Sequence, residues 1–183
     1  MRINKLALTN FRSYNSLELD LEPGVITFIG DNGSGKTNIA ESLIYLAFLS
    51  SHRVANNVPL ISLGNQQAII RAEVQRDERT LQIDLEINAS KANRARINGN
   101  PTRSQRELLG AIQIVYFSPE DLDLVRGEPG NRRDFLDRLL ITRTPRLAGV
   151  ITDYERVVKQ RNALLKTRTS AAALVPWNEQ LIK

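Results

Sequence analysis

A glycine-rich loop between two apolar segments constrains this chain more than any other feature. Residues 30–37 read Gly-Asp-Asn-Gly-Ser-Gly-Lys-Thr and match the pattern G-x-x-x-x-G-K-[ST] at every position. The preceding run, Val25–Ile29, is apolar and mostly β-branched, which predicts a strand buried on both faces, as in a parallel sheet. Residues 39–49 carry apolar side chains at helical spacing and predict a buried helix. Strand, loop and helix in this order predict a site for the phosphates of a nucleoside triphosphate.

Each residue type in the loop has a physical role in this prediction. The glycines permit backbone conformations that are closed to residues with a Cβ, so N–H groups can turn toward phosphate oxygens. The positive end of the following helix adds to this attraction. Lys36 is expected to reach the β- and γ-phosphates, and the Thr37 hydroxyl to ligate Mg²⁺. The predicted nucleotide-binding loop comprises Gly30, Asp31, Asn32, Gly33, Ser34, Gly35, Lys36, Thr37 and Asn38.

Alternating apolar and polar residues predict further strands in the first two thirds of the chain. A charged turn and an Asn98-Gly99 turn predict two hairpins among them. A second continuous apolar run predicts another buried strand. The predicted strands cover residues 3–11, 17–21, 68–75, 81–87, 94–97 and 100–103, with the second buried strand at Ile112–Phe117.

The remainder of the chain reads as helical and basic. Ser118-Pro119 has the composition of a helix start, and Phe135, Leu136, Leu139 and Leu140 form an apolar face further on. Residues 1–125 hold 13 Lys and Arg against 14 Asp and Glu, whereas residues 126–183 hold 12 against 6. We therefore expect a nucleotide-binding lobe at 1–125 and the start of a truncated, basic helical subdomain at 126–183. Its charge fits either contact with nucleic acid or a solvated helical surface.

Composition excludes several classes of site. The chain has no cysteine and one histidine, so it has neither a disulfide nor a thiolate or multi-histidine metal centre. It contains no run of about 20 apolar residues and does not begin with a signal-peptide pattern. These features predict a cytoplasmic protein.

The sequence contains several longer motifs: Leu6–Tyr14, Gly30–Asn38, a pattern of Leu43, Leu46, Ser50 and Arg53 with Ser51-His52 inserted, Phe117–Leu122, Leu124–Gly127, Pro129 and Arg132–Asp137. Together these motifs resemble the RecF family of ABC- and SMC-like ATPases. Two strand-like segments precede the phosphate loop and hairpins follow it, as in that superfamily. The fold expected from the resemblance is α/β: a P-loop NTPase of ABC/SMC-like type with a mixed sheet and an antiparallel subdomain, followed by a helical subdomain, the sheet being incomplete in this chain.

The resemblance implies both ligands and partners. It places Arg12 and Ser13 near the adenine and phosphates of ATP, although a surface salt bridge is the alternative for Arg12. It implies ATP with Mg²⁺, an ATP-dependent homodimer, and binding to double-stranded and gapped DNA. It also implies help to RecO and RecR in loading RecA during DNA repair, replication restart and the SOS response. Arg132 and Arg133 are candidate DNA-phosphate contacts, or else a solvated helix start or partners of Asp134 or Asp137.

Two elements of a complete catalytic site are not found in the sequence. It has no Leu-Ser-x-Gly signature, and its apolar run Ile112–Phe117 ends in Ser118 and not in Asp-Glu. We therefore expect the chain to keep the phosphate loop without completing the catalytic site alone. The alternatives are another SMC-like DNA-processing ATPase, a P-loop small-molecule kinase, and an interaction module that holds phosphate without chemistry.

Overall fold

The chain folds as two compact units. The computed structural model describes residues 1–54, 56–167 and 170–182. It separates into Met1–Glu128 and Pro129–Lys183, whereas the sequence changes from nearly neutral to basic after residue 125. No helix in the described ranges is long and apolar enough to cross a membrane.

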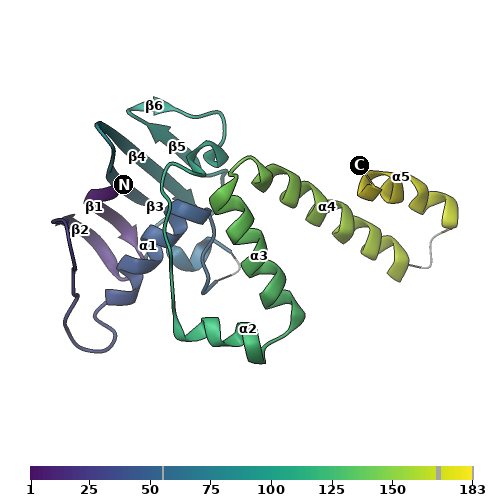
Figure 1. Ribbon diagram of the computed structural model, residues 1–183, viewed down its shortest axis with the longest axis horizontal. Coiled ribbons are helices and arrows are strands. Elements are labelled where there is room, and N and C mark those ends of the chain that lie inside the picture. The colour runs from purple at the N-terminus through teal and green to yellow at the C-terminus, as the bar shows by residue number, and fades with distance from the viewer. Residues whose placement is uncertain (55, 168–169, 183) are drawn as a thin grey trace. The chain divides into compact units, whose positions relative to one another are not determined.

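The first unit is built on a six-stranded antiparallel sheet. Its strands lie in the order β2-β1-β3-β4-β5-β6, and each neighbouring pair is antiparallel (Figure 1). The antiparallel part of the predicted fold is thereby confirmed. The strands are β1 (Arg2–Phe11), β2 (Tyr14–Asp20), β3 (Gln67–Arg76), β4 (Arg79–Asn88), β5 (Arg94–Ile97) and β6 (Asn100–Pro101).

The register of the sheet gathers the apolar side chains on one face. Leu8 of β1 lies opposite Ile70 of β3, which lies opposite Leu85 of β4, and all three are buried. The helix α1 (Lys36–Phe48) lies across the sheet and adds its own apolar residues to the same core (Figure 1). Because α1 begins at the phosphate loop, the core fixes the position of that loop.

Two hairpin turns form where the sequence predicts them. β3 and β4 pair as far as Arg76 and Arg79, and the intervening Asp77 takes a positive φ of 54°. Between β5 and β6, Asn98 and Gly99 have φ values of 51° and 77°, the left-handed conformation of a tight two-residue hairpin. Both hairpin predictions are confirmed.

The two predicted buried strands are wrong for this structure. Val25–Ile29 and Ile112–Phe117 form no strand, and Val25 and Val115 are almost fully exposed. A strand needs a neighbour to satisfy its backbone N–H and C=O groups, and within the described ranges neither segment pairs with a strand of the sheet. An apolar run shows that a segment can be buried, but it does not identify what buries it.

From Ser118 onward the described chain is mainly helical, as predicted. Short 3₁₀ turns occur at η1 (Val58–Leu60) and η2 (Gln105–Leu108), and η3 (Pro119–Leu122) leads into α2 (Asp123–Arg126). The predicted helix start is present at Ser118, whose backbone N–H donates to Asp121 Oδ2 at 2.6 Å. The second unit comprises α3 (Pro129–Arg143), α4 (Leu147–Lys166) and α5 (Ala171–Ile182).

The second unit holds together chiefly through α4 and α5. Arg161 Nε on α4 donates to Asn178 Oδ1 on α5 at 2.7 Å, and Val157 of α4 is buried. The apolar side chains that the sequence places on one face of α3 remain substantially exposed, Phe135 and Leu139 among them. Arg132 and Arg133 are also exposed on α3, as the predicted DNA contact requires.

Candidate phosphate-binding site

The predicted phosphate loop joins β2 to α1 and ends in a helix start without a side-chain cap. Gly33 and Gly35 have φ values of 85° and 99°, in the region that favours glycine. Gly35 is the N-cap of α1, and no side chain accepts from the first amides of the helix there. No acidic residue lies in the first turn of α1. The N–H groups of Lys36 and Thr37 and the positive end of the helix therefore suit an anion.

Lys36 folds back over the loop that precedes it. Its Nζ donates to the carbonyl oxygens of Gly30 at 2.6 Å and Asp31 at 2.7 Å, and lies 3.4 Å from Ser34 Oγ. The ammonium therefore sits among partial negative charges at the mouth of the loop. Phosphate oxygens carry more negative charge than carbonyl oxygens, so a phosphate can take over these hydrogen bonds.

A polar cavity of about 380 Å³ lies beside the loop. This volume falls within the range of small-ligand pockets. Seven residues line it, of which six belong to the predicted set and the seventh, Arg53, does not. They are Asn32, Gly33, Gly35, Lys36, Thr37, Asn38 and Arg53. Arg53 occurs in a motif that the sequence analysis recognised, but no role was assigned to it there.

The end of β1 and the start of β2 pack directly on the loop. A Cβ built on Gly35 would lie 2.7 Å from Tyr14 Oη and 2.9 Å from Ser13 Oγ. Asn38 Nδ2 donates to Ser13 Oγ at 3.0 Å, which brings two of the predicted residues together. Tyr14 was missed as part of the site, although it belongs to the same Phe-Arg-Ser-Tyr motif.

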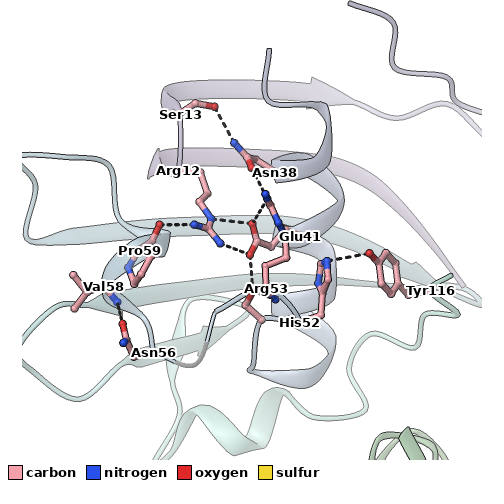
Figure 2. Close-up of polar contacts among 11 residues, drawn as sticks. Arg12, Ser13, Asn38, Glu41, His52, Arg53, Asn56, Val58, Pro59 and Tyr116 are labelled. Atoms are coloured by element: carbon pink, nitrogen blue, oxygen red, sulfur yellow. Dashed lines mark hydrogen bonds and ion pairs between the residues drawn. The ribbon is translucent and has the colours of Figure 1, made fainter. Parts of the chain in front are cut away.

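Arg12 makes a two-pronged ion pair with Glu41 of α1 (Figure 2). Arg12 Nε donates to Glu41 Oε2 at 2.8 Å and Nη2 to Oε1 at 2.5 Å, while Nη1 donates to the Pro59 carbonyl at 2.9 Å. The Arg12 side chain is 16% exposed and that of Glu41 fully buried, so this is no surface salt bridge. A contact between Arg12 and a nucleotide remains a prediction.

The Glu41 carboxylate accepts hydrogen bonds from other side chains besides Arg12. Ser51 Oγ donates to its Oε1 at 2.5 Å, and Arg53 Nη1 lies 3.4 Å from its Oε2. Burial by itself raises the pKa of the Glu41 carboxyl, but the hydrogen bonds of Arg12 and Ser51 and the charges of both arginines outweigh it. The pKa therefore stays below its usual range, and the buried group is ionised.

Two residues of the segment after α1 contact Glu41. Ser51 and Arg53 do so, so it is the inserted Ser51 that takes part in the site. His52 Nε2 lies 2.9 Å from the Tyr116 hydroxyl, with ring centroids 4.8 Å apart. This pair ties the segment to the apolar run at 112–117 (Figure 2).

The residues suit a metal that is held mainly by its nucleotide. In the described part of the chain no group of three or more His, Cys, Asp or Glu residues can hold a metal ion. Mg²⁺ characteristically keeps several waters and binds through substrate phosphates with one or two protein oxygens. Thr37, at the start of α1 and on the cavity wall, is placed to offer one such oxygen.

The fold and the loop define a P-loop-type ATPase domain. The sequence profile of the AAA ATPase domain family matches residues 1–135. The chain belongs to this family. A solved SMC ATPase structure, described as showing ATP-driven dimerization and DNA-stimulated activation, shares the fold with a TM-score of 0.60 at 21% identity, covering 75% of this chain and 98% of the other.

Within this class, the resemblance to the N-terminal part of RecF is confirmed. The chain is 59% identical over 168 residues to DNA replication and repair protein RecF of Renibacterium salmoninarum, covering 91% of this chain and 42% of the relative. It is 53% identical over 189 residues to RecF of Kineococcus radiotolerans, covering 99% and 48%. A RecF–ATP structure from the RecFOR pathway superposes with a TM-score of 0.87 at 26% identity, covering 98% and 49%. The chain thus spans about half the length of these relatives.

Proposed function

We propose that this chain binds ATP with Mg²⁺ on the loop Gly30–Thr37. The observation that carries the proposal is the cavity in which Lys36 and Arg53 both lie beside an uncapped helix start. Two cations and the first amides of a helix are the elements that a triphosphate tail needs for binding. The ATP-bound RecF structure with the same fold supports the choice of nucleotide.

Each group has a defined part in this binding. The amides at the start of α1 donate to phosphate oxygens, and Lys36 exchanges the carbonyls of Gly30 and Asp31 for phosphate oxygens. The Thr37 hydroxyl would ligate Mg²⁺, which would supply positive charge to the phosphate chain. Asn38 and Ser13 hold the helix start against β1 and β2. ATP itself supplies the reactive phosphoanhydride.

We further propose that the chain serves a RecF-like protein of DNA repair and replication. Relatives carrying that name match more than nine tenths of this chain, and this supports the assignment. The protein would dimerise through ATP, bind double-stranded and gapped DNA, and act with RecO and RecR to load RecA. Arg132 and Arg133, exposed on α3, are the proposed DNA-phosphate contacts.

Catalysis in this proposal needs more than the described residues. The runs Val25–Ile29 and Ile112–Phe117 have the composition of buried strands yet expose Val25, Ile29, Val115 and Phe117, and the relatives are about twice as long as this chain. We propose that the remainder of such a polypeptide supplies their neighbours together with the signature motif and the acidic residues that orient water.

A thermal-shift series tests the nucleotide proposal. A ligand that binds only the folded state at 100 times its Kd stabilises it by about 2.7 kcal/mol, which raises Tm by several degrees. We expect this rise with Mg-ATP for the wild type and for the exposed-lysine control Lys91→Ala, and a rise at most about half as large for Lys36→Ala, whose affinity should be at least tenfold lower. An equal rise in Lys36→Ala would contradict the proposed site.

A further inference from the structure

We propose that Glu41 is the positioning residue of the phosphate pocket: its buried carboxylate fixes Arg53 beside Lys36, so that two side-chain cations meet the phosphates. The inference rests on the proposed ATP binding and deepens it. Arg53 contacts the ligand, whereas Glu41 acts only through Arg53.

Glu41 holds Arg53 at two points. Ser51 Oγ donates to Glu41 Oε1 at 2.5 Å and accepts from the backbone N–H of Arg53 at 3.0 Å. The guanidinium Nη1 of Arg53 lies 3.4 Å from Glu41 Oε2 and 3.2 Å from Asn38 Oδ1 (Figure 2). The backbone and the side chain of Arg53 are therefore both tied to one carboxylate. This reduces the rotamer entropy that a long side chain loses when it meets a ligand.

The carboxylate is itself fixed. Glu41 lies on α1, which begins at Lys36, and its side chain is fully buried. Arg12 donates a hydrogen bond to each oxygen of Glu41, so the carboxylate cannot rotate without breaking two charged hydrogen bonds. The position of Arg53 is thus fixed relative to α1, the helix that begins at the phosphate loop.

The charges in this cluster favour a further anion. One carboxylate faces the guanidinium groups of Arg12 and Arg53, which leaves a net positive charge beside the pocket. Arg12 makes the short, buried contacts, whereas the Arg53 contact is long and its side chain is 41% exposed. Arg53 is therefore the cation that can turn toward a phosphate while Arg12 keeps Glu41 satisfied.

A purely structural role for Glu41 makes a different prediction. If Glu41 only neutralises Arg12, its replacement lowers stability but leaves the ligand affinity of the folded protein unchanged. If it positions Arg53, the affinity for the phosphate chain falls as well, and it falls only while Arg53 is present. The coupling between residues 41 and 53 therefore separates the two roles.

The test is a double-mutant cycle on Glu41→Gln and Arg53→Met. Calorimetry measures the binding of Mg-ATP and of inorganic tripolyphosphate, a probe without base or sugar, and circular dichroism verifies folding. We expect each single change to weaken both ligands roughly tenfold, the effect of one charged hydrogen bond. The double variant should weaken them by about the same factor. Asp84→Asn, which breaks the Arg71 ion pair on the sheet, should bind like the wild type.

The possible results are decisive in each direction. Wild-type affinity in folded Glu41→Gln, or a double variant roughly a hundredfold weaker, would overturn the positioning role. If Glu41→Gln does not fold, Ser51→Ala replaces it: a smaller loss of affinity, dependent on Arg53, supports the role, and no loss overturns it. If the wild type itself binds neither ligand, the proposed ATP site fails and this inference with it.

Discussion

The hydroxyl of Tyr14 occupies the space in which a side chain at Gly35 would begin. A Cβ at this glycine would lie 2.7 Å from Tyr14 Oη, and the backbone there has a φ of 99°. Two independent constraints therefore require glycine at position 35: the positive φ of its backbone and the close approach of Tyr14. The β1–β2 hairpin thus shapes the loop as well as the sheet.

We predict that Gly35→Ala destabilises the protein by about 1–3 kcal/mol and abolishes tight ATP binding. Strain at positive φ contributes roughly 1–2 kcal/mol of this loss, and the contact with Tyr14 adds to it. Denaturant unfolding and calorimetry measure the two effects. The double variant Gly35→Ala/Tyr14→Leu should recover part of the stability, because the contact is relieved and the strain is not. No recovery would argue against the contact.

Arg12→Ala should cost about 3–5 kcal/mol, because it leaves the buried carboxylate of Glu41 without its main partner. Arg12→Lys should recover little of this, since an ammonium cannot make the two parallel hydrogen bonds. Equilibrium unfolding in urea provides the measurement, with Arg71→Ala as the control at an exposed ion pair. Equal losses for Arg12→Ala and Arg71→Ala would refute the importance of the buried pair.

The lowered pKa of Glu41 predicts a specific acid sensitivity. The folded-state pKa lies below the ordinary value of 4.5, so the ionised group contributes its full stability at pH values above 4.5. This contribution disappears as the pH falls through the folded-state value, while Arg12 and Arg53 stay charged. Unfolding free energies measured from pH 6 down to pH 3 should fall less steeply for Glu41→Gln than for the wild type. Parallel curves would contradict the assignment.

Thr37→Ala should lower the affinity for ATP only when Mg²⁺ is present. We expect ATP affinity to fall roughly tenfold in the presence of Mg²⁺, because a metal-bridged contact is lost. Without Mg²⁺ the variant should bind like the wild type. Calorimetric titrations with magnesium and with EDTA make this comparison. An equal loss in both conditions would remove Thr37 from the proposed metal site.

Local patterns predicted the antiparallel sheet well. The alternation in β1 and β2 and the Asn98-Gly99 turn depend on interactions between close neighbours, which a sequence displays directly. The runs Val25–Ile29 and Ile112–Phe117 were predicted less well. Whether they form strands depends on pairing partners, and among the described residues neither run pairs with a strand of the sheet.

The sequence predicted the phosphate loop, but it did not predict the side chains that line and support it from elsewhere in the chain. The glycines, Lys36 and Thr37 form a contiguous motif, whereas Arg53 reaches the cavity only through the fold. One signal was available: Glu41 is a charged residue inside a helix that the sequence predicts to be buried, and a buried carboxylate requires a cationic partner. Its partners lie 29 residues before it and 12 after it, a separation that no local pattern reveals.

Calorimetric titration of Mg-ATP into the wild type and Lys36→Ala tests the account most directly. The wild type should bind one nucleotide per chain, and Lys36→Ala should bind at least tenfold more weakly while keeping the same circular dichroism spectrum. No binding heat in the folded wild type at any of several temperatures, or the same affinity in both proteins, would contradict the phosphate site at Gly30–Thr37.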